Sequence, residues 1–223
     1  MGAESPGAGR HYRGEAGAEY LSYQRRYGEL GAELNLFKFA PHVRPGDSVV
    51  DFGCGIGALL ERLDAGTKTG VEVNETARRE AEARGLRVVA SSAELEPGSA
   101  DVVVSNHALE HALSPLAELR RLRSVLKPGG KLVLWLPIDD WRAQRRPRAD
   151  PNHHLYTWTP LLLSNLLVET GFEVAQCRVV THAWPPMTRT FSRLPRPLFD
   201  VLARAWAVLR RRRQVMAVAH PRP

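Results

Sequence analysis

The sequence predicts an α/β fold built on a doubly wound, mostly parallel sheet. Short β-branched segments alternate with segments of helical period between residues 48 and 180. Strands separated by helices of this length pair in parallel through right-handed crossovers. The first of these strands also runs directly into a glycine-rich turn at residues 53–57. Alternate glycines allow a tight turn and the close approach of a ligand to the backbone.

The expected elements follow one another along the chain. Strands are predicted over residues 48–51, 69–73, 86–90, 101–105, 131–136, 172–180 and 214–219. Helices are predicted over residues 58–63, 75–85, 115–126, 160–170 and 198–209. Ser114 and Thr159 each precede a proline, and a capping hydroxyl before proline is typical of a helix start. The segment 127–130, with its proline and two glycines, is expected to end one helix before the next strand.

Three regions are expected around this alternation. Residues 1–44 form an N-terminal region, in which a flexible lead-in to about residue 15 precedes a helical lid. Tyr20, Tyr23 and Tyr27 begin an apolar face of helical spacing there, and Gly28 weakens its middle. Residues 45–182 and 213–223 form the core domain. Residues 183–212 form an inserted helical segment, and residues 137–152 form a long polar loop of the kind that is often functional.

Composition narrows the class of protein. The 223 residues carry a net charge of +7, and 43% of them are hydrophobic. Much of the excess charge lies in two clusters, at residues 142–148 and 210–213, without interleaved aromatic residues, which disfavours nucleic acid as a partner. Cys54 and Cys177 have no paired spacing, and no signal peptide or membrane-spanning run is visible. We therefore expect a cytoplasmic protein that is soluble or at most peripherally associated with a membrane.

The glycine-rich turn indicates a ligand that contains adenosine. Gly53, Gly55 and Ala58 fit a loose form of the dinucleotide-binding pattern, and Glu72 follows about twenty residues later. An acid at that position accepts hydrogen bonds from ribose hydroxyls. These features do not choose between a nicotinamide cofactor and another adenosine-containing one.

The pattern of Asp51, Gly53, Gly55 and Gly57 closely resembles the signature loop of class I S-adenosylmethionine-dependent methyltransferases. Segments 70–74, 101–111 and 126–131 resemble the same family, in its order and spacing, over roughly residues 45–180. The resemblance is to the enzymes of small molecules and lipid precursors. It implies a Rossmann-like methyltransferase fold of seven mostly parallel strands with an antiparallel last strand, and S-adenosylmethionine as the cofactor.

The resemblance also implies roles for individual residues. Asp51 would orient the methionine ammonium, Glu72 would hold the ribose, and Asn106 would place its backbone carbonyl near the sulfonium. Ser92 would lie beside the adenine edge where the family often has Asp, so Glu94 is an alternative there. The full expected cofactor set is Asp51, Gly53, Cys54, Gly55, Gly57, Glu72, Val73, Ser92, Ala93, Asn106 and His107.

Proton transfer from the acceptor needs a base only if the acceptor must ionise early. His107, His111 and His154 are the predicted catalytic residues, and Glu110 and His153 are further candidates. Glu110 and His111 match the family's Glu-His pair, for which a structural role is equally compatible with the sequence. A divalent ion held by the acids and histidines of the 139–154 loop is an alternative. We predict no metal site, because adjacent histidines point apart; the alternative set is Asp139, Asp140, Asp150, His153 and His154.

The segment 198–213 combines an apolar helix with four arginines. Packing over the acceptor, contact with a second copy of the chain and contact with an anionic membrane all fit this pattern. The sequence therefore predicts a methyltransferase that acts, through S-adenosylmethionine, on a small-molecule or lipid-linked acceptor, on oxygen. The alternatives are a Rossmann-type NAD(P)-dependent oxidoreductase and a non-catalytic S-adenosylmethionine-binding partner protein. The oxidoreductase is disfavoured because the sequence contains no Tyr-x-x-x-Lys pair.

Overall fold

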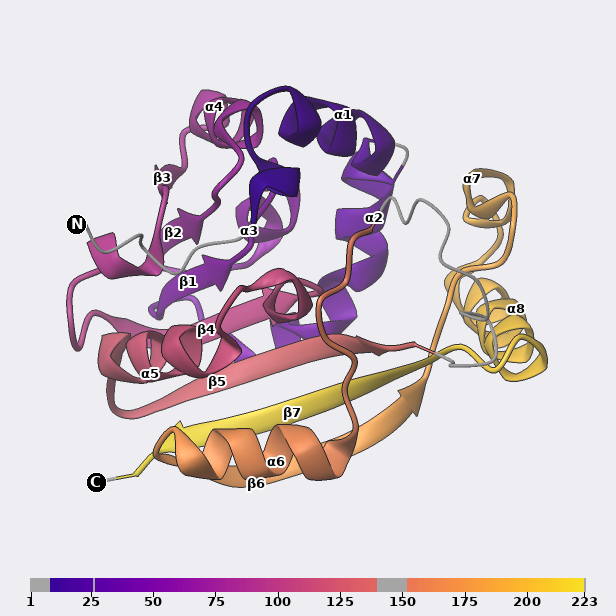
Figure 1. Cartoon of the computed structure of the whole chain (residues 1–223). Coiled ribbons are helices and arrows are strands. Elements are labelled where there is room, and N and C mark those ends of the chain that lie inside the picture. Colours follow the sequence, from indigo (N-terminus) through magenta and orange to yellow (C-terminus); the bar gives the residue numbers. More distant parts are fainter. Residues whose placement is uncertain (1–8, 26, 140–151, 223) are drawn as a thin grey trace.

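The computed structural model describes residues 9–25, 27–139 and 152–222. Within these residues the strands form one seven-stranded sheet in the order β3-β2-β1-β4-β5-β7-β6 (Figure 1). The strands are β1 (Ser48–Phe52), β2 (Thr67–Val71), β3 (Arg87–Val89), β4 (Ala100–Asn106), β5 (Leu126–Ile138), β6 (Phe172–Thr181) and β7 (Arg213–Pro221). The α-helices are α1 (Gly14–Gln24), α2 (Gly28–Asn35), α3 (Ala58–Arg62), α4 (Glu75–Ala83), α5 (Pro115–Val125), α6 (Pro160–Glu169), α7 (Thr188–Phe191) and α8 (Arg196–Leu209).

The strand pairing confirms the predicted fold class. Strands β1–β2, β2–β3, β1–β4 and β4–β5 pair in parallel. Only the last strand, β7, reverses among the described strands, and it pairs antiparallel with both β5 and β6. The strand order changes direction between β1 and β4, and the carboxyl ends of such strands flank a crevice in doubly wound sheets.

Helices cover both faces of the sheet because successive strand residues point to opposite sides. Val50 and Val103 pack in one apolar cluster with α5 and α6. Val49 and Val102 pack in a second cluster with α3 and with Phe39, which follows α2. The side chains of the central strands thus point alternately into two apolar cores, one on each face of the sheet. The candidate site lies at the carboxyl edge of the sheet.

Several predicted boundaries differ from the structure by a few residues, including those of β2 and β5. Strand β2 ends at Val71, so Glu72 lies just beyond the strand end and faces the crevice. Strand β5 begins at Leu126 and includes the segment 127–130, which the sequence predicted to lie between the end of a helix and the start of the strand. Leu126 pairs with Ala100 and Lys131 pairs with Val102, so the glycine-containing segment is an irregularity within the ladder.

Within the described residues, helical structure begins before residue 15, earlier than the sequence predicted. Residues 10–12 form a 3-10 helix, α1 already begins at Gly14, and Tyr12 is buried. The apolar pattern is divided into α1, which ends at Gln24, and α2, which begins at Gly28, the residue expected to weaken its middle. The Asn74 side chain donates to the Gly17 carbonyl at 2.7 Å and thereby ties α1 to the start of α4.

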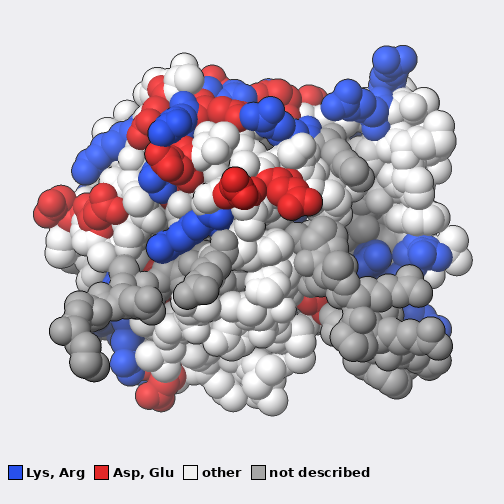
Figure 2. Space-filling view, turned by 45° about the horizontal axis from the view of Figure 1, so that its top comes forward, with Lys and Arg blue, Asp and Glu red and all other residues white. Residues whose placement is uncertain are grey.

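Helices α7 and α8 follow β6 and precede β7 in the chain. In space they lie beyond one end of the sheet and beside α2 (Figure 1). Phe199 and Ala203 of α8 pack against Leu34 of α2. The face that includes α1 and α4 carries interspersed basic and acidic side chains (Figure 2). No helix in the described residues is long and apolar enough to cross a membrane.

Gly57 at the start of α3 provides a test of the loop backbone. Its φ is +76°, and an added Cβ would lie 2.4 Å from Leu86 Cδ1 and 3.0 Å from Ala81 Cβ. We expect Gly57→Ala to lower the free energy of unfolding by about 2 kcal/mol, because it combines left-handed strain with a clash. Urea denaturation measures this. Gly98→Ala, at φ +62° with open space around the added Cβ, is the control that separates the clash from the strain, and an equal loss in both variants would contradict the packing argument.

Candidate active site

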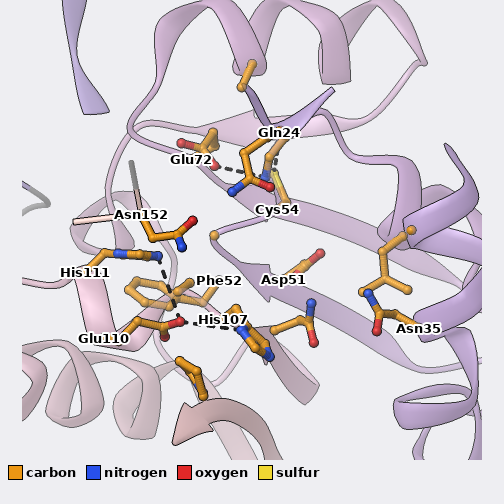
Figure 3. A pocket seen from close by; sticks show the side chains of 18 of the residues that line it. Gln24, Asn35, Asp51, Phe52, Cys54, Glu72, His107, Glu110, His111 and Asn152 are labelled. Atoms are coloured by element: carbon orange, nitrogen blue, oxygen red, sulfur yellow. Dashed lines mark hydrogen bonds and ion pairs between the residues drawn. The ribbon is translucent and has the colours of Figure 1, made fainter. Parts of the chain in front are cut away.

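A cavity of about 800 Å³ opens at the carboxyl edge of the sheet. Asp51 and Asn106, at the ends of β1 and β4, line it together with Tyr20 and Gln24 of α1. Gln214 of β7 reaches the same cavity because an antiparallel strand begins at the edge where its parallel neighbours end. Figure 3 shows Glu72 near Cys54 at one end of the cavity and His107, Glu110 and His111 together at the other.

The glycine-rich turn is held against the end of β2. The N–H groups of Gly53 and Cys54 donate to the Val71 carbonyl at 2.8 and 3.1 Å. Gly53 has a φ of +78°, and an added Cβ would lie 2.3 Å from Ala108 Cβ. A Cβ at Gly55 would instead meet nothing within 4 Å. The first glycine is therefore required by packing, whereas the second leaves open space beside the cavity, as a cradle for a ligand requires.

Two acids face this end of the cavity: Asp51, which is buried, and Glu72, which is half-buried. Burial, followed by the neighbouring Glu72, raises the pKa of Asp51 to about 7. Burial also raises the pKa of Glu72, although Glu72 accepts hydrogen bonds from the N–H groups of Gly55 at 2.9 Å and Asn74 at 2.8 Å. Among the described residues no hydrogen bond reaches the Asp51 carboxylate, so its oxygens remain available to a cationic group such as an ammonium.

Glu118 is a third acid in the lining of the cavity, and it is buried. Ser92 Oγ donates to Glu118 Oε2 at 2.5 Å, and both residues line the cavity. Burial raises the pKa of Glu118. Ala93 and Glu94, the neighbours considered with Ser92, are exposed and lie outside the lining of the cavity. Ser92 and Glu118 are thus a hydrogen-bonded pair of polar side chains in the lining of the cavity.

The opposite end of the cavity gathers the three predicted catalytic histidines around one carboxylate. Glu110 Oε1 lies 3.8 Å from His107 Nδ1, 3.9 Å from His111 Nε2 and 4.0 Å from His154 Nε2. Glu110 is completely buried, and burial raises its pKa to about 8. His153, the remaining candidate, stacks on His11 with ring centroids 4.7 Å apart.

A buried lysine holds the floor below this cluster. Lys38 Nζ donates to Asn106 Oδ1 at 3.0 Å and to Gln214 Oε1 at 2.9 Å, and the same Gln214 oxygen lies 3.1 Å from His107 Nε2. Burial lowers the pKa of Lys38 to about 7. Burial and the nearby Lys38 lower the pKa of His107 to about 3, so the imidazole is neutral. This network fixes the orientation of His107 beside Glu110.

The structure places most of the predicted cofactor residues around the cavity. Gly57 and Ala93 lie outside its lining, and the positive φ of Gly57 identifies it as a residue of the turn and helix start. Three cavity residues have no sequence signal of their own: Tyr12, Lys38 and Gln214. Glu118 has one, because it is an acid on the otherwise apolar, buried side of α5. Asp140 and Asp150 lie outside the described residues.

A methyltransferase-domain family model matches residues 21–177. The ubiquinone biosynthesis O-methyltransferase of Xanthomonas campestris pv. campestris is 38% identical over 102 residues, which are 40% of this chain and 43% of that protein. The ribosomal protein L11 methyltransferase of Cupriavidus necator is 32% identical over 130 residues, which are 46% of this chain and 42% of that protein. The chain thus spans about two fifths of the length of these relatives.

The fold is also similar to that of solved methyltransferase structures. A SAM-dependent methyltransferase from Archaeoglobus fulgidus superposes with a TM-score of 0.63 at 20% identity, over 90% of this chain and 98% of that one. The family match covers the glycine-rich turn, both acids of the cofactor end and the Glu110 cluster. It also favours S-adenosylmethionine over the nicotinamide alternative. The chain therefore belongs to the class I S-adenosylmethionine-dependent methyltransferase family.

Proposed function

We propose that this chain transfers the methyl group of S-adenosylmethionine to a hydroxyl oxygen of a small-molecule or lipid-linked acceptor. The arrangement of the cavity supports this proposal. Its glycine-rich end presents Asp51 and Glu72, and its other end presents the buried Glu110 with its three histidines. A single cavity thus offers a cofactor half and a half rich in proton acceptors, which a hydroxyl nucleophile requires.

The residues of the cofactor half fit their expected roles. When bound, S-adenosylmethionine supplies a methyl group that its sulfonium has already activated. The Asp51 carboxylate accepts hydrogen bonds from the ammonium, and Glu72 accepts them from the ribose hydroxyls while its backbone partners hold it in place. Ser92 and Glu118 meet the adenine edge. Helix α1 contributes Tyr20, Leu21 and Gln24 to the lining of the cavity, and its proposed role is to limit the access of water.

The acceptor half contains groups that can accept the hydroxyl proton of the acceptor. The acceptor hydroxyl lies beside the Glu110 cluster, and its oxygen forms a bond to the methyl carbon as the carbon–sulfur bond breaks. The hydroxyl proton passes to the cluster, either to Glu110 or to a neighbouring imidazole. Positioning of the oxygen in line with the sulfonium contributes most of the rate, and proton acceptance contributes about 10²- to 10⁴-fold.

Calorimetry and transfer assays test this function. We expect S-adenosylhomocysteine to bind and NADH not to bind. Among acceptors, we expect phenols and catechols to be methylated in preference to the corresponding amines. NADH binding in place of S-adenosylhomocysteine would support the oxidoreductase, and preferred methylation of the amines would contradict transfer to oxygen. Cofactor binding without transfer to any acceptor of the panel would support the non-catalytic partner protein.

The exposed side of α8 supports the lipid-linked form of the acceptor. Leu198, Val201, Val208 and Leu209 recur at helical spacing and are 49–74% exposed. The exposed arginines 210–212 follow the helix directly. An apolar stripe beside cations fits an anionic membrane surface. Helix α8 also packs on α2, which lines the cavity, so a membrane bound there would lie near the acceptor end.

Flotation with phosphatidylglycerol vesicles tests this contact. We expect the wild-type protein to float and the double variant Val201→Asp/Leu209→Asp to remain at the bottom. Leu161→Asp, at a 69% exposed residue of α6, is the matched control and should float. Binding that is equal for both variants would contradict the α8 surface. A concentration-dependent dimer that the double variant abolishes, without vesicle binding, would assign α8 to a second copy of the chain.

A further inference from the structure

The Glu110 carboxylate lacks the partners that a buried charge requires. Both of its side-chain oxygens are buried without a hydrogen bond from the described residues. Its backbone carbonyl accepts hydrogen bonds from the N–H groups of Leu155 at 3.0 Å and Tyr156 at 3.3 Å, which hold the 154–156 segment over the carboxylate. A carboxylate buried in this way is strongly unfavourable unless a proton or a cation compensates its charge.

The hydrogen bonds of Tyr12 determine which ring nitrogen of His111 carries the proton and which carries a lone pair. The Tyr12 hydroxyl lies 2.6 Å from the Asn152 carbonyl oxygen and 2.6 Å from His111 Nδ1. A hydroxyl has one proton, and a carbonyl oxygen can only accept. Tyr12 therefore donates to Asn152 and accepts from His111 Nδ1–H. In the neutral imidazole this leaves an unprotonated Nε2, which lies 3.9 Å from Glu110 Oε1.

His154 is oriented in the same way from the other side. Its Nδ1 lies 2.9 Å from Asp139 Oδ2, and a carboxylate can only accept, so Nδ1 carries the proton. In the neutral form of the ring, Nε2 carries the lone pair, and this atom lies 4.0 Å from Glu110 Oε1. A carboxylate that holds the far nitrogen of a histidine is the arrangement that orients histidine ligands in metal sites.

We propose that Glu110, His111 and His154 bind one divalent transition-metal ion at the acceptor end of the cavity. Their ligand atoms all lie within 4.8 Å of one another. An ion at the centre of such a triangle lies roughly 2.3–2.5 Å from each atom, so each ligand must move by only a few tenths of an ångström to reach zinc distances of about 2.0–2.1 Å. The sequence predicted no metal, because the adjacent His153 and His154 were expected to point apart, and it did not bring Glu110 and His154 together.

The ligand set selects the class of ion. Two imidazoles and one carboxylate suit zinc, iron, cobalt or nickel, whereas magnesium and calcium prefer sites built from oxygen ligands. Three protein ligands leave a position open, and all three residues line the cavity. This inference rests on the proposed function for its role: the open position would bind the acceptor hydroxyl and favour its ionised form.

Zinc binding to the purified chain, without an affinity tag and stripped with a chelator, tests the site directly. We expect one zinc equivalent per chain in competition with a chromogenic chelator, and a visible absorption spectrum of nitrogen- and oxygen-bound cobalt when Co²⁺ replaces zinc. Glu110→Gln and His154→Ala should each weaken zinc binding at least about 100-fold, and Asp139→Asn should weaken it about 10- to 100-fold. His182→Ala, at another histidine of the cavity, is the control and should retain zinc.

The possible outcomes distinguish a failure of the metal site from a failure of the proposed function. Absence of a bound zinc or cobalt equivalent in the wild-type protein would overturn the metal site, as would zinc affinity unchanged in both Glu110→Gln and His154→Ala. S-adenosylhomocysteine binding to the stripped chain is measured in parallel. If S-adenosylhomocysteine binds and the metal does not, only the metal site is wrong; if the metal binds and S-adenosylhomocysteine does not, the proposed function is wrong.

Discussion

Asp51→Asn is expected to weaken the binding of S-adenosylhomocysteine about 10- to 100-fold at pH 8. The variant retains the shape of the side chain and removes the charge that faces the ammonium, and a hydrogen bond to a charged group contributes about 1.5–3 kcal/mol. The pKa of Asp51 is raised to about 7 in the free protein, so the carboxylate is largely ionised at pH 8 and largely protonated at pH 6. Wild-type affinity should therefore fall about tenfold between these two pH values.

Calorimetry at both pH values measures this effect. Asp51→Asn should show little pH dependence, because it has no carboxylate to protonate. Asp64→Asn removes an exposed acid that follows α3, and it should bind as the wild type does at both pH values. If Asp51→Ala and Glu72→Ala both retained wild-type affinity, the cofactor end would be assigned to the wrong part of the cavity.

Glu110→Gln is expected to lower the rate of methyl transfer at least about 100-fold while it changes S-adenosylhomocysteine affinity less than about twofold. The amide has the size of the carboxylate but accepts no proton and is a weak metal ligand. Glu110 is completely buried without a hydrogen-bond donor among the described residues, so removal of its charge should not lower the melting temperature. Transfer to the best acceptor of the phenol and catechol panel gives the rate.

Glu118→Gln is the matched variant at the other end of the cavity. It also removes a buried acid, but one that hydrogen-bonds Ser92 on the cofactor wall. We expect it to weaken S-adenosylhomocysteine binding and to leave the rate at saturating cofactor within about threefold. If Glu110→Gln lost cofactor affinity and Glu118→Gln lost transfer rate, the cofactor and acceptor halves would be exchanged.

Local patterns in the sequence were sufficient for the fold and for much of the lining of the cavity at the glycine-rich turn. The alternation of apolar strands and amphipathic helices depends on burial along a single element, so it is visible in the residues themselves. The spacing of Asp51, Gly53 and Gly55 is likewise local, because one strand and one turn position all three. Glu72 follows from the next strand in the chain. The antiparallel direction of the last strand, β7, was implied by family resemblance rather than by the residues, and its place between β5 and β6 was not predicted.

The acceptor end was decided by the tertiary structure. Lys38 meets Gln214 across 176 positions of the chain, and Tyr12 meets His111 across 99. Such pairs leave no periodic signal, since their contact depends on how the N-terminal helices and the last strand close over the sheet edge. The sequence identified His107, His111 and His154 as separate candidates for a base. Only the folded chain gathers them around Glu110, because the backbone of Glu110 itself holds the 154–156 segment in place.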